Sequence, residues 1–155
     1  MEFIPIDIEQ HRDYLIPFRK DSFIVSFGTD EGLGDEEKYL DWVQQQAQQN
    51  PKGFVLVVEN GTPIGQLELT VKPFAGKEIG YVNLYYLVPE KRGMGLGLRL
   101  HAYAMQYFKD SGLNEYHLRV SPTNKSALAF YKKNGMEPID VEFDGKVIRM
   151  AGCIW

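Results

Sequence analysis

The chain of 155 residues is long enough for one domain with a substantial core, and its 44% apolar and 25% charged residues are ordinary for a globular protein. A net charge of −4 argues against general nucleic-acid binding, and the single cysteine excludes a disulfide framework. Three scattered histidines show no metal-ligand spacing, and no apolar run approaches the ~18 residues of a membrane span. The N-terminus carries no signal-peptide pattern, so we expect a cytoplasmic protein with no metal, nucleic-acid or membrane partner.

The N-terminal half predicts a strand, helical segments and an antiparallel hairpin, in that order. Pro17 is expected to divide the first helical segment, because proline opens helices and disrupts their interior. Asp35 is a good N-cap for a further helix, and Asn60-Gly61 is a strong signal for a two-residue hairpin turn. The expected elements are a strand at 1–7, helical pieces within 11–23, a loop at 28–34, a helix from 35 to near 50, and strands at 54–59 and 64–71.

The C-terminal half alternates strands and helices. Apolar residues fall at helical spacing from Leu96 until Gly112 stops the helix, and strands rich in Val, Ile and Tyr lie on both sides. Such a strand–helix–strand unit makes its two strands parallel. The expected elements are strands at 78–88 and 116–121, a helix at 123–134 and a closing hairpin on the two-residue turn Asp144-Gly145. We therefore expect an α/β (α+β) fold, a single domain over residues 1–155 around a mixed sheet.

The stretch EKRGMGLGLRL, residues 90–100, places glycines at every second position between a strand and a helix. The first N–H groups of a helix lack partners and favour an anion, and glycines remove the Cβ atoms that would keep a phosphate away. Arg92 adds a forked cationic donor, within a local positive patch that also contains Lys91, Arg99, Lys132 and Lys133. The dinucleotide fingerprint fails because Leu98 replaces its third glycine. The stretch predicts a phosphate-binding loop, and a tight turn without a ligand is the alternative.

Two linked motifs resemble the GNAT superfamily of N-acetyltransferases. The family's R/Q-x-x-G-x-G/A motif is matched by Arg92, Gly93, Met94, Gly95, Leu96 and Gly97. Its second hallmark, an asparagine followed by Ser-Ala and an aromatic–tyrosine pair, is matched in SPTNKSALAFYKKNGM at 121–136. The close resemblance spans 78–138 and implies the GNAT fold, in which a mostly antiparallel central sheet contains one splayed pair of parallel strands.

The resemblance further implies acetyl-CoA as cosubstrate. The backbone N–H groups of residues 93–97 would hold its pyrophosphate, with Arg92 beside it. The remaining contacts would come from Leu87 and Val88, pairing with the pantetheine arm, from Asn124 on the far wall and from Phe130, packing on the cofactor.

Tyr131 matches the tyrosine that is often assigned as general acid in this family. Attack of an amine on the thioester expels a thiolate. With a thiol pKa of ~8.5 and a tyrosine pKa of ~10, full proton transfer is uphill by about 2 kcal/mol. Even an unshifted tyrosine stabilises the leaving sulfur by hydrogen bonding. The general base is either Glu68 or Glu78, or the enzyme has none. Without a base, the enzyme would bind the amine from solution in its unprotonated form.

The expected function is therefore an N-acetyltransferase that transfers an acetyl group from acetyl-CoA to a primary amine by direct attack in a ternary complex. The alternatives are a non-catalytic acyl-CoA-binding sensor and a structural domain. The acceptor is open among small-molecule amines and peptides, as are the length of the acyl donor and a homodimer, which is common in the family. The acidic run of Asp30, Glu31, Asp35, Glu36 and Glu37 either attracts a cationic amine or only caps a solvated helix.

Overall fold

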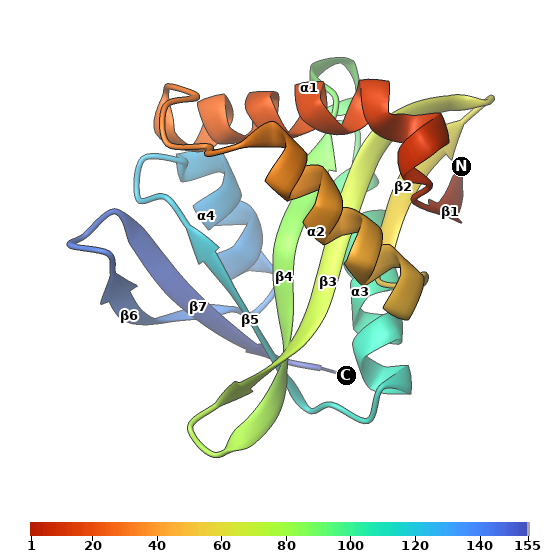
Figure 1. Cartoon of the computed structure of the whole chain (residues 1–155). Helices are drawn as coiled ribbons and strands as arrows, with labels where there is room; N and C mark the ends of the chain where they lie inside the picture. Colours follow the sequence, from red (N-terminus) through yellow and green to blue (C-terminus); the bar gives the residue numbers. More distant parts are fainter. Residues whose placement is uncertain (155) are drawn as a thin grey trace.

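The computed structural model describes residues 1–154 and consists of one mixed sheet with helices on both faces (Figure 1). The strands are β1 (Glu2–Pro5), β2 (Phe54–Glu59), β3 (Thr62–Phe74), β4 (Lys77–Leu87), β5 (Glu115–Val120), β6 (Glu137–Glu142) and β7 (Val147–Cys153). The helices are α1 (Ile8–Phe27), α2 (Glu36–Gln49), α3 (Leu96–Asp110) and α4 (Lys125–Lys133), with a 3₁₀ turn at Pro89–Lys91. The expected α/β fold with a mixed sheet is confirmed.

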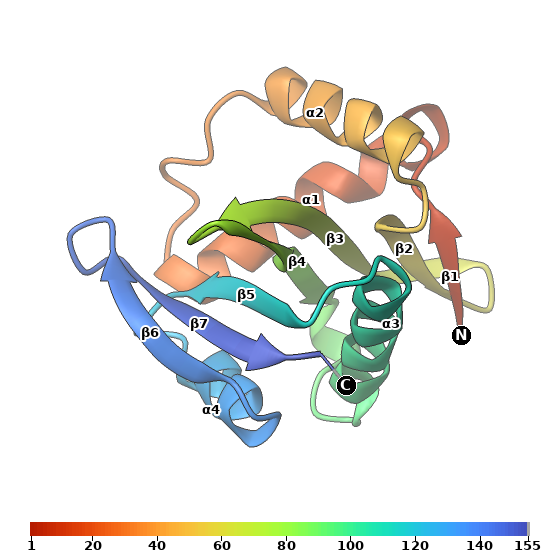
Figure 2. The same cartoon turned by 90° about the horizontal axis from the view of Figure 1, so that it is seen from below.

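The strand order in the sheet is β1-β2-β3-β4-β5-β7-β6. Among the strands of residues 1–154, only β4 and β5 pair in parallel, as the strand–helix–strand pattern predicted, and the other neighbours are antiparallel. Helices α1 and α2 cover one side of the sheet, here called the front face, and α3 and α4 lie on the back face (Figure 2). Each face has its own apolar core. The front core includes Leu15, Val43 and Leu56, and the back core includes Leu67, Leu118 and Phe108.

The parallel pair is short and then splays. Its register runs from Gly80 opposite Tyr116 to Val82 opposite Leu118, and β4 continues without β5 to Leu87. A β-bulge marks the point of departure, because Glu68 of β3 lies opposite Leu84 while Leu69 lies opposite Val82. Asn83 is the extra residue, and its side-chain amide donates to the hydroxyl of Thr70 at 2.8 Å. The final part of β4 therefore presents a free edge toward β5.

Two local predictions were wrong. Helix α1 runs unbroken from Ile8 to Phe27 with Pro17 inside it. A proline removes only one helical hydrogen bond, and burial of Leu15 and Phe18 on either side holds the helix on the sheet. The closing hairpin turns through four residues, 143–146, rather than two, because Phe143 joins Asp144 and Gly145 at positive φ.

Gly80 allows α3 to approach β4 closely. A Cβ atom built at this glycine would lie 2.6 Å from the ring of Phe108, which is fully buried in the back core. We expect Gly80→Ala to lower the free energy of unfolding by about 1–3 kcal/mol, measured by urea denaturation. Adding Phe108→Leu should recover part of this loss relative to the sum of the single changes. If the two single changes in the free energy of unfolding added exactly in the double variant, this would contradict a direct contact between position 80 and Phe108.

Candidate functional site

A cleft opens where β4 and β5 separate. It consists of a cavity of about 450 Å³ beside α3 and α4 and a smaller one of about 170 Å³ toward the end of α1. The residues that line both cavities are Val25, Tyr85, Tyr86, Leu87, Arg92, Asn124, Ala127 and Tyr131. Because so many residues are shared, the two cavities form one continuous cleft through the splayed strands.

The glycine loop forms one wall of the larger cavity. Gly93 and Gly95 have φ values of 74° and 79°, which residues with a side chain rarely adopt. Gly95 is also the N-cap of α3, so no cap side chain occupies the first N–H groups of that helix. A Cβ atom at Gly97 would lie 3.2 Å from the ring of Phe130. Gly93 and Gly95 are therefore favoured by their backbone conformation, and Gly97 is favoured because a side chain there would crowd Phe130. The loop fits an anion such as a pyrophosphate.

Arg92 lines the same cavity but is tethered. Its Nε donates to the carbonyl oxygen of Leu87 at 2.9 Å, and its Nη2 donates to Asp21 at 2.7 Å. Asp21 also accepts a 2.6 Å hydrogen bond from the hydroxyl of Tyr86, whose pKa is raised, first by burial and then by this bond. Arg92 therefore ties α1 to the end of β4, and its charge is partly neutralised. Lys91 is likewise paired, with Glu59 at 2.5 Å, so the local positive patch expected from the sequence is weaker than its residue count suggests.

The free edge of β4 presents Leu87 rather than Val88 to the cleft. The N–H of Val88 donates to the carbonyl of Ile64 on the β3 side at 2.8 Å. Successive residues of a strand point their backbone groups to opposite sides, so those of Leu87 face the cleft. The structure brings Leu87, Gly93, Gly95, Gly97 and the α4 residues together around the larger cavity. Three expected contact residues, Val88, Met94 and Leu96, do not line either cavity.

The opposite wall comes from α4 and the loop before it. Asn124 caps this helix, since its Oδ1 accepts from the N–H of Ala127 at 3.2 Å, which leaves its amide NH₂ for the cleft. Phe130 and Tyr131 follow in the last turns and line the larger cavity. Burial raises the pKa of Tyr131 to about 12. Its ring centroid lies 6.4 Å from that of Tyr85, whose buried hydroxyl has no hydrogen-bond partner within residues 1–154.

Neither candidate base reaches the cleft. Glu68 is 4% exposed and faces α2, where its carboxylate accepts hydrogen bonds from the hydroxyl of Tyr39 and, at 2.8 Å, from Nε2 of Gln66. Burial raises the pKa of Glu68 to about 7. Glu78 is exposed and lies opposite Pro73, near the far end of the β3–β4 hairpin. Neither carboxylate lines either cavity.

Sequence reasoning missed part of the smaller cavity. Arg119 of β5 and Ser22 of α1 line it together with Asn83 and Tyr131. These residues are far apart in the sequence, and no local motif connects them. Among residues 1–154, no group of His, Cys, Asp or Glu side chains could hold a metal ion, and none of the helices is long and apolar enough to cross a membrane.

Comparisons with known proteins agree on one family. Residues 14–136 match the model of the acetyltransferase (GNAT) family. An uncharacterized N-acetyltransferase of Methanocaldococcus jannaschii is 28% identical over 66% of this chain, and a mycothiol acetyltransferase of Paenarthrobacter aurescens is 33% identical over 60%. These matches span only 46% and 30% of the two relatives' own lengths.

Solved structures match over nearly the whole chain. The PaiA N-acetyltransferase of Thermoplasma acidophilum, solved in complex with coenzyme A, is 25% identical, with a TM-score of 0.72 and 98% of both chains covered. A ribosomal-protein-alanine N-acetyltransferase of Brucella melitensis is 16% identical and shares the fold, with a TM-score of 0.76 and 99% of both chains covered. The names of the mycothiol acetyltransferase and the ribosomal-protein-alanine N-acetyltransferase indicate different acceptors, so the comparisons do not carry one acceptor to this chain.

Proposed function

This chain belongs to the GNAT family of acetyltransferases, and from that premise we propose that it transfers the acetyl group of acetyl-CoA to a primary amine by direct attack in a ternary complex. The observation that carries the proposal is one continuous cleft that has the glycine loop and the uncapped start of α3 at one end and is lined by Tyr131 in both of its cavities. A phosphate site and a hydrogen-bond donor on one cleft suit a phosphate-bearing thioester. When bound, acetyl-CoA supplies the activated acetyl group.

The chain's own residues would bind and orient this cosubstrate. The N–H groups at the start of α3 and the tethered Arg92 fit the pyrophosphate. At the free edge of β4 the carbonyl of Leu87 already accepts from Arg92, so its N–H is the group that fits an amide carbonyl of the pantetheine arm. The amide NH₂ of Asn124 and the ring of Phe130 face this arm from α4. These assignments require no metal ion.

Tyr131 would act as a hydrogen-bond donor to the leaving sulfur. Attack by the amine nitrogen forms the amide bond and breaks the carbon–sulfur bond, whose electron pair goes to sulfur; the amine loses one proton and the thiol gains one. With a pKa of about 12, Tyr131 stays protonated at neutral pH. Full proton transfer to a thiolate of pKa ~8.5 would cost about 5 kcal/mol, more than an unshifted tyrosine would require. Donation of a hydrogen bond without full transfer is therefore the favoured role.

Calorimetric titration of the intact protein tests the phosphate end of this proposal. We expect micromolar binding of acetyl-CoA. S-acetylpantetheine, which lacks the pyrophosphate, should bind roughly 100-fold more weakly, a loss of about 3 kcal/mol. Arg92→Ala should weaken acetyl-CoA binding by roughly tenfold or less, because Asp21 already neutralises part of the charge.

The matched control is Arg99→Ala, which removes the same charge from an exposed residue of α3 that does not line the cleft. Its affinity should equal that of the unchanged protein. If acetyl-CoA and S-acetylpantetheine bound equally well, the assignment of the pyrophosphate site would be wrong. If acetyl-CoA did not bind at millimolar concentration, the proposed function would be wrong.

A further inference from the structure

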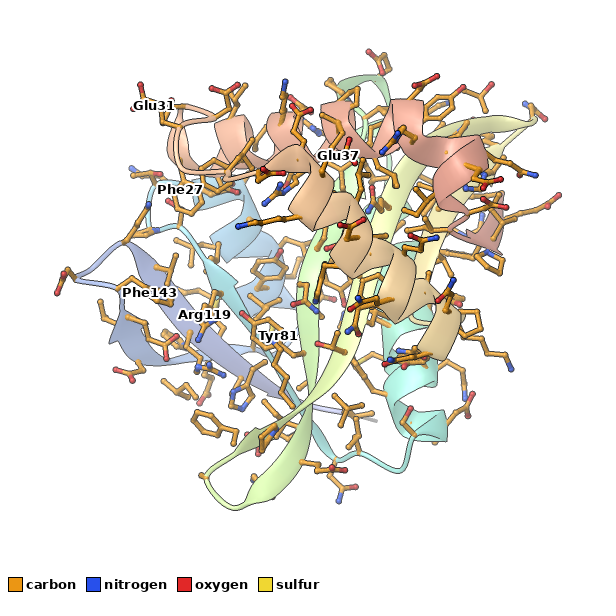
Figure 3. All side chains as sticks on the ribbon, viewed as in Figure 1. Phe27, Glu31, Glu37, Tyr81, Arg119 and Phe143 are labelled. Carbon is orange, nitrogen blue, oxygen red and sulfur yellow. The ribbon has the colours of Figure 1, made fainter. Side chains whose placement is uncertain are left out.

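Three cations from three different strands gather around one tyrosine on the front face. Nζ of Lys72 (β3) lies 4.1 Å from the ring centroid of Tyr81, and the guanidinium carbons of Arg119 (β5) and Arg149 (β7) lie 5.7 and 5.8 Å from it. We call Lys72, Arg119, Arg149 and Tyr81 the basic floor. Figure 3 shows Tyr81 and Arg119 on the part of the front face that α1 and α2 leave uncovered.

The positive charge of the basic floor is not balanced within the described chain. Glu142 accepts hydrogen bonds from Nε of Arg119 at 2.7 Å and from Nε of Arg149 at 3.1 Å, so one carboxylate serves two guanidinium groups. Lys72 forms no ion pair with any carboxylate of residues 1–154. Its pKa is lowered, mainly by burial and then by the two arginines. Two net positive charges thus remain in a protein whose overall charge is −4.

Arg119 connects the basic floor to the candidate active site. It lines the smaller cavity together with Tyr131 and Asn124, but it does not line the larger cavity that holds the glycine loop. The basic floor is therefore separate from the phosphate site assigned to the cosubstrate. Lys72, Tyr81 and Arg149 line neither cavity, so Arg119 is the member of the basic floor that an acceptor in the smaller cavity would contact.

The acidic run of the α1–α2 loop does not offset this charge. Glu36 pairs with Lys20 at 3.2 Å, Glu37 pairs with Arg12 at 2.9 Å, and Asp35 caps α2. Figure 3 places Glu31 at the outer end of this loop and Glu37 on α2, both apart from Arg119 and Tyr81. The sequence left a cationic acceptor open on the basis of these acids, but the charged side chains that line the smaller cavity, Arg92 and Arg119, are both cationic.

We propose that the acceptor is an amine that also carries an acidic group, a carboxylate or a phosphate, which Arg119 and the rest of the basic floor hold while the amine faces Tyr131. This inference rests on the proposed transferase function and specifies its substrate class. Lys72 and Arg119 are exposed, so an acceptor in solution can reach both. Cationic groups that lack enough carboxylate partners form charge-assisted hydrogen bonds with such an anion. The aromatic face of Tyr81 keeps Lys72 and Arg119 in place for it.

Matched acceptor pairs test the inference by turnover. The amines are γ-aminobutyrate against butylamine and phosphoethanolamine against ethanolamine, with putrescine as a dication, each measured by thiol release from acetyl-CoA. We expect the anionic member of at least one pair to have a kcat/KM at least roughly tenfold above its neutral partner and above putrescine. Lys72→Gln and Arg119→Gln should each reduce this ratio, mainly by raising the KM of the anionic amine.

Binding measured without turnover separates the two proposals. Inorganic phosphate and γ-aminobutyrate are titrated into the protein saturated with coenzyme A. Saturable binding of either probe should weaken at least roughly fivefold in Lys72→Gln and Arg119→Gln, but not in Lys109→Gln, which removes an exposed lysine from the back-face helix α3.

The outcomes are distinct. Absence of anion binding, or binding that neither substitution changes, would overturn the inference even if acetyl-CoA binds and neutral amines are acetylated. Preference for putrescine over both anionic amines would also overturn it. The separate calorimetric titration would detect a failure to bind acetyl-CoA, and that result would overturn the transferase function itself.

Discussion

Replacing Tyr131 with phenylalanine should lower kcat by roughly 100-fold and leave the affinity for acetyl-CoA within about twofold. The change removes the hydroxyl that we place at the leaving sulfur but keeps the ring that lines the cleft. Because the pKa of Tyr131 is about 12, the hydroxyl is protonated throughout the neutral range. The tyrosine itself should therefore introduce no pH step in kcat below pH 9. Thiol-release kinetics and calorimetry on the same preparation measure both effects.

Tyr107→Phe is the matched control. It removes a hydroxyl from α3 at a site that lines neither cavity of the cleft. Its kcat should match that of the unchanged protein. An unchanged kcat in Tyr131→Phe would exclude the hydroxyl as a proton donor, and a protein that binds acetyl-CoA but acetylates no amine would instead favour the sensor alternative.

The contribution of Glu68 to the free energy of unfolding should fall by up to about 3 kcal/mol as pH rises from 4.5 to 7. Burial raises the folded-state pKa of this carboxyl to about 7, from an ordinary value of 4.5 in the unfolded chain. Below pH 4.5 both states are protonated, so the stabilisation is fully present. Between these values the unfolded state loses its proton first and stability declines, and above pH 7 the loss is complete. Urea denaturation at pH 5 to 8 measures the slope.

Glu68→Gln should flatten this slope, because an amide does not titrate in this pH range. The amide has nearly the same shape, and its oxygen still accepts the hydrogen bond from Tyr39. Glu78→Gln, which alters an exposed carboxylate on the adjacent strand, should keep the slope of the unchanged protein. Ion-paired carboxylates such as Glu115 and Glu142 have lowered pKa values, so their contribution is lost at more acidic pH, outside this window. A slope that survives in Glu68→Gln would assign the titration to another group.

Elements defined by local chemistry were predictable from the sequence. Asn60 and Gly61 both have positive φ, as the two-residue turn requires, and Asp35 accepts a hydrogen bond from the N–H of Lys38 as the N-cap of α2. The glycine loop was identified for the same reason, since its spacing, the strand before it and the helix after it are all local. Each of these signals depends on a few consecutive residues whose conformations are restricted.

Features that depend on tertiary packing were not predictable. Pro17 is a local helix breaker, but burial of its neighbours outweighs the single lost hydrogen bond. The partner of Arg92 is Asp21, which lies 71 residues earlier. The basic floor combines Lys72, Arg119 and Arg149 from three strands, and its assembly depends on the strand order, which no pairwise sequence signal gives.

The bulge at Asn83 has a consequence for how this strand can change during evolution. Gly80 and Val82, before the bulge, contact the back core, and Tyr85 and Leu87, after it, also pack there, so the alternation shifts by one residue at this position. Loss of one residue here would turn the end of β4 over and move Tyr85 out of the cleft. Residues of β4 that are not tightly packed, unlike Gly80, can therefore be substituted one at a time, but the length of β4 between the hairpin and the glycine loop cannot change by one residue.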